Sequence, residues 1–210
     1  MIHHSAPQGS EDWLAARRAV ITGSRFRDAR DCLKNGKPSD KQLGYARDVA
    51  RERVGGMVPA TYANAAMRTG TEQEPIAKLN YEEETGLLVH SAGFITTDDA
   101  RFGVSVDGLV GDDGVIEIKT MVSSNTLFKA IVEEDHSDYI DQCNGAMWLL
   151  GRKWTDLILW APDLANAGRK GLHIIRIERD DDEIEKLEAD LMKFAVLVDE
   201  FETKLRLKAA

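Results

Sequence analysis

The sequence predicts an α/β or α+β domain with a central mixed sheet flanked by helices. Helix-capping and turn signals dominate residues 10–86, a period of two begins at residue 87, and helical segments return from residue 125 onward. This α-β-α order is typical of helices packed on a sheet. With 210 residues, 43% of them hydrophobic, residues 1–210 are expected to form a single domain with a sizeable core.

Capping and turn residues mark four helices in the first part of the chain. Ser10 can cap the first helix, and Ser39 begins a capping-box pattern. Gly55-Gly56 and Gly86 can end helices. Pro75 must lie in the first turn of its helix or kink it. The predicted helices cover residues 10–18, 24–33, 39–54 and 69–85.

Strands are expected where apolar residues follow a period of two. They cover residues 87–96, 102–110, 114–120, 154–161 and 171–178. Two helices, over residues 125–132 and 139–150, separate the third strand from the fourth.

The last predicted helix, residues 180–208, has an acidic first turn and a basic last turn, as the helix dipole favours. Its apolar residues follow a 3-4 spacing that forms a heptad seam: Ile184, Leu187, Leu191, Phe194, Val198, Phe201 and Leu205. We expect this seam to pack on the chain's own sheet, with a contact to another subunit as the alternative.

Charge is distributed unevenly along the chain. The formal net charge is −9, yet residues 13–56 hold 11 Lys and Arg against 5 Asp and Glu, a local charge of +6. This distribution favours one basic face and one acidic face, although charged helices that are simply solvated would give the same count.

Several classes of protein are disfavoured. No apolar run approaches the roughly 20 residues of a membrane span, and the first residues, MIHHSAPQGSED, contain no apolar segment of a secretory signal. Cys32 and Cys143 fit no zinc or iron–sulfur spacing and are expected to be reduced thiols. We therefore expect a cytoplasmic protein that does not enter a membrane.

The stretch VDGLVGDDGVIEIKT, residues 106–120, predicts a β-hairpin that carries charges at core-like positions. Alternate residues of a strand share a face, so Glu117 and Lys119 point the same way. Asp107 reaches that face only if the residue numbers of paired positions have an even sum. We therefore predict a loop of three or five residues, or a bulge at a flanking glycine.

Two carboxylates a few Å apart repel one another unless a proton or cation lies between them. Mg²⁺ prefers oxygen ligands, so Asp107 and Glu117 are candidate metal ligands, and Lys119 can orient a water or steady a negative charge. Glu74, near the start of a predicted helix, would add a third carboxylate. The alternative is an exposed Glu–Lys pair on a solvated sheet face, with Glu74 an ordinary surface charge.

Six segments together resemble the phage lambda-exonuclease family of YqaJ-type viral recombination nucleases, which has the PD-(D/E)XK restriction-endonuclease-like core. They are QGSEDWLAARRAVITGSRF, RTGTEQEP, FGVSVDGLV, VIEIKT, YIDQCNGAMW and GLHIIRIERD. The resemblance extends from about residue 8 to residue 200. Its middle segments occur in many nucleases of this fold, whereas the first segment and the helix with Gln142 are more specific.

The resemblance implies a role for each matching residue. The metal ligands would be Glu74, Asp107, Glu117 and the carbonyl of Ile118, with Lys119 as the catalytic lysine. A pocket for a 5′-phosphate would be formed by Arg17, Ser24, Ser105 and Gln142. DNA would be contacted by Met67 as an apolar wedge and by Lys34, Lys37 and Lys41 in a loop where the family has an arginine. Trp13 would either contact DNA or pack beside Arg17.

The implied activity is metal-dependent 5′→3′ digestion of double-stranded DNA, which releases 5′-mononucleotides and leaves 3′ overhangs for recombination by strand annealing. Two Mg²⁺ ions are expected, and Mn²⁺ could substitute. The resemblance also implies a homotrimeric ring around DNA, a single-strand annealing protein as partner, and a phage or prophage protein acting in the cytoplasm of a bacterial host. The alternatives are a structure- or site-specific endonuclease on the same core and a DNA-binding module with a decayed site.

Overall fold

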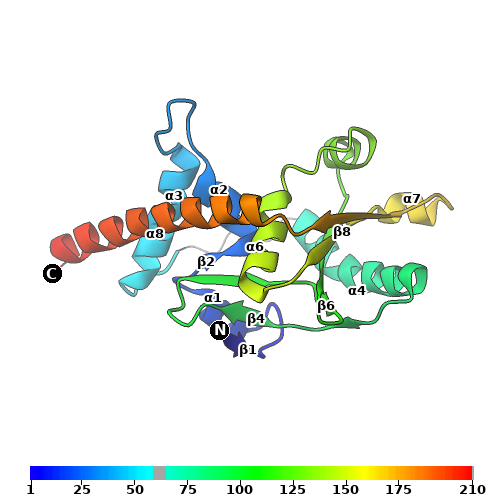
Figure 1. Cartoon of the computed structure of the whole chain (residues 1–210), viewed down its shortest axis with the longest axis horizontal. Helices are drawn as coiled ribbons and strands as arrows, with labels where there is room; N and C mark the ends of the chain where they lie inside the picture. Colours follow the sequence, from blue (N-terminus) through cyan, green and yellow to red (C-terminus); the bar gives the residue numbers. More distant parts are fainter. Residues whose placement is uncertain (59–64, 210) are drawn as a thin grey trace.

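The computed structural model describes residues 1–58 and 65–209, and its larger sheet has five strands (Figure 1). These strands are β3 (Val89–His90), β6 (Gly108–Val110), β7 (Gly114–Thr120), β8 (Trp154–Trp160) and β9 (Leu172–Glu178). They lie side by side in the order β3-β6-β7-β8-β9. β7 and β8 are parallel and the other pairs are antiparallel, so the sheet is mixed as predicted.

A second mixed sheet holds four short strands. They are β1 (Ile2–His4), β2 (Ile21–Thr22), β4 (Phe94–Thr96) and β5 (Phe102–Ser105). Their order is β1-β4-β5-β2, with β2 parallel to β5. β1 and β2 were not predicted.

The predicted single sheet is therefore divided, because two predicted strands each contribute to both sheets. Residues 87–96 separate into β3 and β4 around Gly93, whose φ is +70°. A side chain at Gly93 would meet the carbonyl oxygen of His4, which explains the glycine at this turn. Residues 102–110 separate at Asp107, between β5 and β6. Asp107 consequently lies at the junction of the two sheets.

The predicted helix caps are confirmed. Ser10 accepts a hydrogen bond from the backbone N–H of Trp13, and Ser39 accepts one from that of Gln42, each at 3.2 Å. Pro75 lies in the interior of its helix, which excludes placement in the first turn. No described helix is long and apolar enough to cross a membrane. The helices are α1 (Glu11–Arg17), α2 (Phe26–Arg30), α3 (Asp40–Arg53), α4 (Ala65–Thr85), α5 (Ser124–Leu127), α6 (Ile140–Leu150), α7 (Pro162–Asn166) and α8 (Asp181–Ala209), with a 3₁₀ turn over Gly23–Arg25 and a π-helical turn over Phe128–Val132.

The heptad seam of α8 packs mainly on helices rather than on the sheet. Its principal neighbours are α3, α2 and α6, and α8 runs alongside them in Figure 1. The buried part of the seam consists of Ile184, Leu187, Leu191, Phe194 and Val198. We expected the seam to pack on the chain's own sheet, and this expectation is wrong, because the seam packs mainly on other helices of the same chain. The surface that receives the seam forms only when α2 and its neighbour α3 are brought together with α6, a contact between remote segments of the chain.

Strand β7 is covered on both faces by helices. Ile116 and Ile118 belong to a core cluster with Ala77 and Tyr81 of α4. The opposite face directs Glu117 toward α6, where Gln142 donates a hydrogen bond to it. The apolar alternation of β7 thus buries the isoleucines and presents its charged residues to α6.

Candidate active site

The β6–β7 hairpin has the predicted register. Gly108 pairs with Ile116 and Val110 pairs with Gly114, so paired residue numbers have an even sum. Three residues, 111–113, form the loop, and Gly111 has a φ of +51°. Because Gly108 pairs with Ile116, the preceding residue Asp107 lies opposite Glu117. An oxygen of Asp107 accepts a hydrogen bond from the backbone N–H of Ile118 at 2.6 Å. The prediction of a three- or five-residue loop is confirmed.

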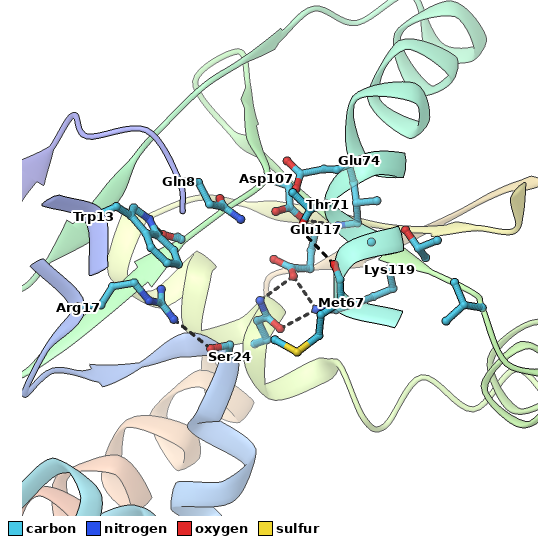
Figure 2. A pocket seen from close by; sticks show the side chains of 16 residues that line it. Gln8, Trp13, Arg17, Ser24, Met67, Thr71, Glu74, Asp107, Glu117 and Lys119 are labelled. Atoms are coloured by element: carbon cyan, nitrogen blue, oxygen red, sulfur yellow. Dashed lines mark hydrogen bonds and ion pairs between the residues drawn. The ribbon is translucent and has the colours of Figure 1, made fainter. Parts of the chain in front are cut away.

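A pocket of about 500 Å³ opens beside this hairpin (Figure 2). In the view of Figure 2, Trp13, Arg17 and Ser24 lie at one end, and Glu74, Asp107, Glu117 and Lys119 lie at the other. The pocket is lined by Gln8, Trp13, Arg17, Ser24, Met67, Gly70, Thr71, Glu74, Ser105, Asp107, Glu117, Ile118, Lys119, Thr120, Val122 and Gln142. Every residue predicted as a metal ligand, catalytic lysine or phosphate contact is among them.

At the acidic end, Lys119 and Gln142 both bind Glu117. The Lys119 ammonium lies 2.8 Å from Glu117 Oε1 and 3.0 Å from Gln142 Oε1. The Gln142 amide nitrogen donates to Glu117 Oε1 at 2.6 Å. Gln142 is thus engaged with the acid and the lysine here, rather than with the hydroxyl groups at the other end of the pocket.

Burial dominates the electrostatics of the acids. It raises the pKa of Glu117 to about 7, although the Lys119 ammonium acts in the opposite direction. Burial also raises the pKa of Asp107, and burial together with the charge of Asp107 raises that of Glu74. Burial lowers the pKa of Lys119, but the Glu117 carboxylate beside it acts in the opposite direction, and the pKa of the lysine is raised overall.

This set of donors fits a hard divalent cation. All the candidate ligands are oxygens, and a cation would offset the cost of holding the buried Glu117 and the two partly buried carboxylates beside it ionised. Within residues 1–58 and 65–209, no three acidic, histidine or cysteine side chains already stand close enough to hold one ion. Two lysines of the protein partly offset these negative charges. Lys119 pairs with Glu117, and Lys78 lies 3.7 Å from Glu74.

The other end of the pocket is built around Arg17. Its guanidinium donates to Ser24 Oγ at 3.4 Å and lies 4.3 Å from the centre of the Trp13 ring and 5.3 Å from that of Phe94. The Trp13 indole N–H donates to Ser105 Oγ at 2.9 Å. Burial lowers the pKa of Arg17, yet an arginine remains charged at neutral pH.

The sequence profile of the YqaJ-like viral recombinase domain matches residues 12–153. The chain belongs to this family. The match covers both ends of the pocket, from Trp13 and Arg17 to Gln142.

Solved structures extend the similarity beyond the YqaJ-like region. An alkaline exonuclease, LHK-Exo from Laribacter hongkongensis, is 33% identical, with a TM-score of 0.82 over 95% of this chain and 98% of that one. Its complex with dAMP gives a TM-score of 0.83 at the same identity and coverage. A phage-related exonuclease from Haemophilus somnus, 16% identical with a TM-score of 0.68 over 92% of this chain and 97% of that one, shares the fold. A comparison with curated proteins finds no match.

The predicted DNA-contacting residues are not all brought to the pocket. Met67 and Trp13 line it. Lys34, Lys37 and Lys41 do not: they are exposed on or beside the α2–α3 connection, which projects from the body beside α3 in Figure 1. Lys41 lies 3.8 Å from Asp28. A DNA contact by these lysines stays a prediction.

Several contributors to the site were missed by sequence reasoning, and Gln8, Lys78 and Phe94 are the ones that bear on its charged groups or its lining. Gln8 lies between Trp13 and Asp107 in Figure 2, and its signal was its place at the start of the first motif. Lys78 follows Glu74 by one helical turn, a spacing that favours an ion pair. Phe94 carried no signal, because a buried aromatic residue in a strand is normally part of the core.

Proposed function

We propose that this chain is a metal-dependent exonuclease that digests the 5′-ended strand of double-stranded DNA. It would release 5′-mononucleotides and leave 3′ overhangs that serve recombination by strand annealing. The family match and the 33% identity to an alkaline exonuclease over 95% of the chain support a nuclease. The family resemblance implies the direction of digestion and the requirement for an end, and the arrangement of the pocket supports both.

The observation that carries this proposal is the polarity of the pocket. Arg17 has no acidic partner among the described residues, although it is half-buried. Glu117 and Lys119 form an acid–base pair at the opposite end of the same pocket. A strand whose terminal phosphate is bound at Arg17 would extend toward Glu117, so that the cut falls close to its 5′ end.

The metal would be held by Glu74, Asp107, Glu117 and the carbonyl of Ile118. Bound divalent ions, two Mg²⁺ or Mn²⁺ in its place, would lower the pKa of a water and offset the charge of the phosphoryl group. Lys119 would steady the negative charge that develops on the phosphate oxygens and hold the attacking water. Gln142 would keep the Lys119 amine directed at Glu117, as its contacts to both indicate.

The protein would act as a homotrimer encircling DNA, with Met67 separating terminal bases and Lys34, Lys37 and Lys41 contacting the backbone. A single-strand annealing protein would bind the 3′ overhang. The setting would be the cytoplasm of a bacterial host, with the gene carried by a phage or prophage.

The deciding experiment compares DNA ends in the presence of Mg²⁺. A linear duplex labelled on its 5′-phosphate should release labelled mononucleotide at once, whereas a 3′ label should remain in long single strands. A covalently closed circle should stay intact. Cutting of the circle would instead establish an endonuclease, and inactivity of the wild-type protein on every substrate together with retained DNA binding would favour a DNA-binding module.

Site variants complete that experiment. Glu117→Ala and Lys119→Ala should remove digestion, while Lys153→Ala, an exposed lysine paired with Asp113, should retain it. Digestion at the wild-type rate by either of the first two variants would refute the proposed site.

A further inference from the structure

Arg17 is held between two aromatic rings that come from different elements. Trp13 precedes it by one turn of α1, which sets both side chains on one side of the helix. Phe94 comes from β4 and is fully buried. Both ring faces attract a cation, so the guanidinium is stabilised without a carboxylate. Its donors therefore remain available to an anion from outside the chain.

The two hydroxyl groups of this end are oriented by the same side chains. Ser105 Oγ accepts from the Trp13 indole N–H, and Ser24 Oγ accepts from Arg17. A serine hydroxyl that accepts in this way keeps its own hydrogen to donate elsewhere. Within the described part of the chain, neither hydroxyl donates to another protein group. Both therefore remain donors for a ligand in the pocket.

We propose that Trp13 is a positioning residue for the terminal 5′-phosphate: its ring holds Arg17, and its indole N–H orients Ser105 as a donor. This inference rests on the proposed function and deepens it. Trp13 would act through Arg17 and Ser105, rather than by stacking on a DNA base. The ligand is a phosphate monoester, since a guanidinium and two hydroxyl donors converge on one end of the pocket.

The two interpretations of Trp13 differ in what they predict for DNA without a terminal phosphate. A residue that stacks on a base helps phosphorylated and unphosphorylated ends equally. A residue that positions Arg17 and Ser105 helps only the phosphorylated end. The ratio of affinities for the two ends therefore separates the interpretations, whereas the affinity for one end does not.

The test measures binding of short duplexes with 5′-phosphate or 5′-hydroxyl ends in EDTA, so that no cleavage occurs. Trp13→Phe keeps a ring beside Arg17 and removes the N–H donor, and Ser105→Ala removes its acceptor. Each should lower the preference for 5′-phosphate by about 10-fold, the typical effect of one hydrogen bond to a charged group. The double variant should lose no more than the larger single loss, because both act along one path.

Trp154→Phe is the matched control. Trp154 also stacks on an arginine, Arg176 at 3.8 Å, but it does not line the pocket. Its replacement should leave the phosphate preference unchanged. Thermal unfolding midpoints of all variants identify any loss that reflects misfolding, and Phe94→Leu, which removes the second ring, should reduce the preference in the same direction as Trp13→Phe.

Three results would overturn the proposal. They are an equal loss for both ends in Trp13→Phe, no loss for either end in Trp13→Phe, and additive losses in the double variant. If the wild-type protein itself shows no preference, phosphate recognition fails with this inference, while Mg²⁺-dependent digestion that requires Glu117 would still stand. In initial-rate measurements with Mg²⁺, Trp13→Phe should raise KM for phosphorylated ends more than it lowers kcat, because the contact that is lost holds the phosphate rather than the reacting atoms.

Discussion

Two clusters in this molecule stack an arginine on a tryptophan, and they differ in what else each arginine contacts. Arg176 lies 3.8 Å from the Trp154 ring and forms two hydrogen bonds of 2.8 Å with Asp156. Tyr81 donates a third hydrogen bond to the same carboxylate at 2.7 Å. Every charge in that cluster has a partner from the protein.

Arg17, by contrast, has a hydroxyl and two aromatic rings, and no carboxylate within the described residues. Across the pocket, the three acids have one close ion pair, between Lys119 and Glu117, and Lys78 lies further away, 3.7 Å from Glu74. A cluster whose charges are matched internally stabilises the fold. A cluster whose charges are not matched by other groups of the protein lowers the stability of the fold, and its donors and acceptors remain available to a ligand.

The largest expected difference between the clusters is in catalysis. Glu117→Gln preserves the shape of the side chain but removes the charge, so we expect a loss of digestion on the order of 10³-fold. Its unfolding midpoint should change little, because the desolvation cost of the acid is removed while Lys119 loses its carboxylate partner, and the two effects oppose each other. Initial rates on linear duplex in Mg²⁺ and a thermal melt measure both quantities.

The matched variant in the cluster around Asp156 should lose stability and keep its activity. Asp156→Ala removes a carboxylate that is 1% exposed and leaves Tyr81 and Arg176 without their acceptor. Arg176 is partly solvated, so we expect a loss of about 2–3 kcal/mol in the free energy of unfolding, at the low end for a broken buried pair. Urea denaturation measures this loss. Activity per folded molecule should persist, and its disappearance would mean that the cluster also shapes the site.

The sequence predicted the hairpin well because its register, whether paired residue numbers have an even or an odd sum, depends only on residues close together in the chain. The requirement that Asp107 and Glu117 share a face predicted an even register, and with it a loop of three or five residues or a bulge, of which the structure has the three-residue loop. The same reasoning could not separate the two clusters. Asp156 is also an acid in an apolar strand, WTDLILW, and gives the same local signal as Glu117.

The partners that distinguish these acids come from distant parts of the chain. Asp156 is neutralised from β9 and α4, and Glu117 meets Gln142 of α6. The division into two sheets and the packing of α8 on helices likewise depend on contacts between remote segments. Family resemblance supplied the pocket residues that spacing could not, including Arg17 and Ser24, but it gave no indication of Phe94.

Replacing the two arginines should give intermediate and distinguishable effects. Arg17→Lys keeps the charge but loses the fork of donors, so the preference for 5′-phosphorylated ends should fall about 10- to 100-fold with little change in stability. Arg176→Lys should lower stability and leave the preference intact. Competition binding between phosphorylated and hydroxyl-ended duplexes tests both variants, and an unchanged preference in Arg17→Lys would contradict a bidentate contact.

The smallest expected effect is a dependence of stability on pH that arises in the pocket. The pKa of Glu117 is about 7 in the folded protein, against an ordinary value of 4.5. Between these values the folded state retains a proton that the unfolded chain has released, so stability is greatest below about pH 4.5 and declines toward pH 7.

Metal-free protein should therefore lose about 1–2 kcal/mol of unfolding free energy over that range. Urea denaturation in EDTA at pH 5 and pH 8 measures the loss. Glu117→Gln should flatten the profile, and Mg²⁺ should restore stability at pH 8 by binding the folded state. A Glu117→Gln profile as steep as that of the wild type would assign the titration to Asp107 or Glu74 instead, since burial raises the pKa of both.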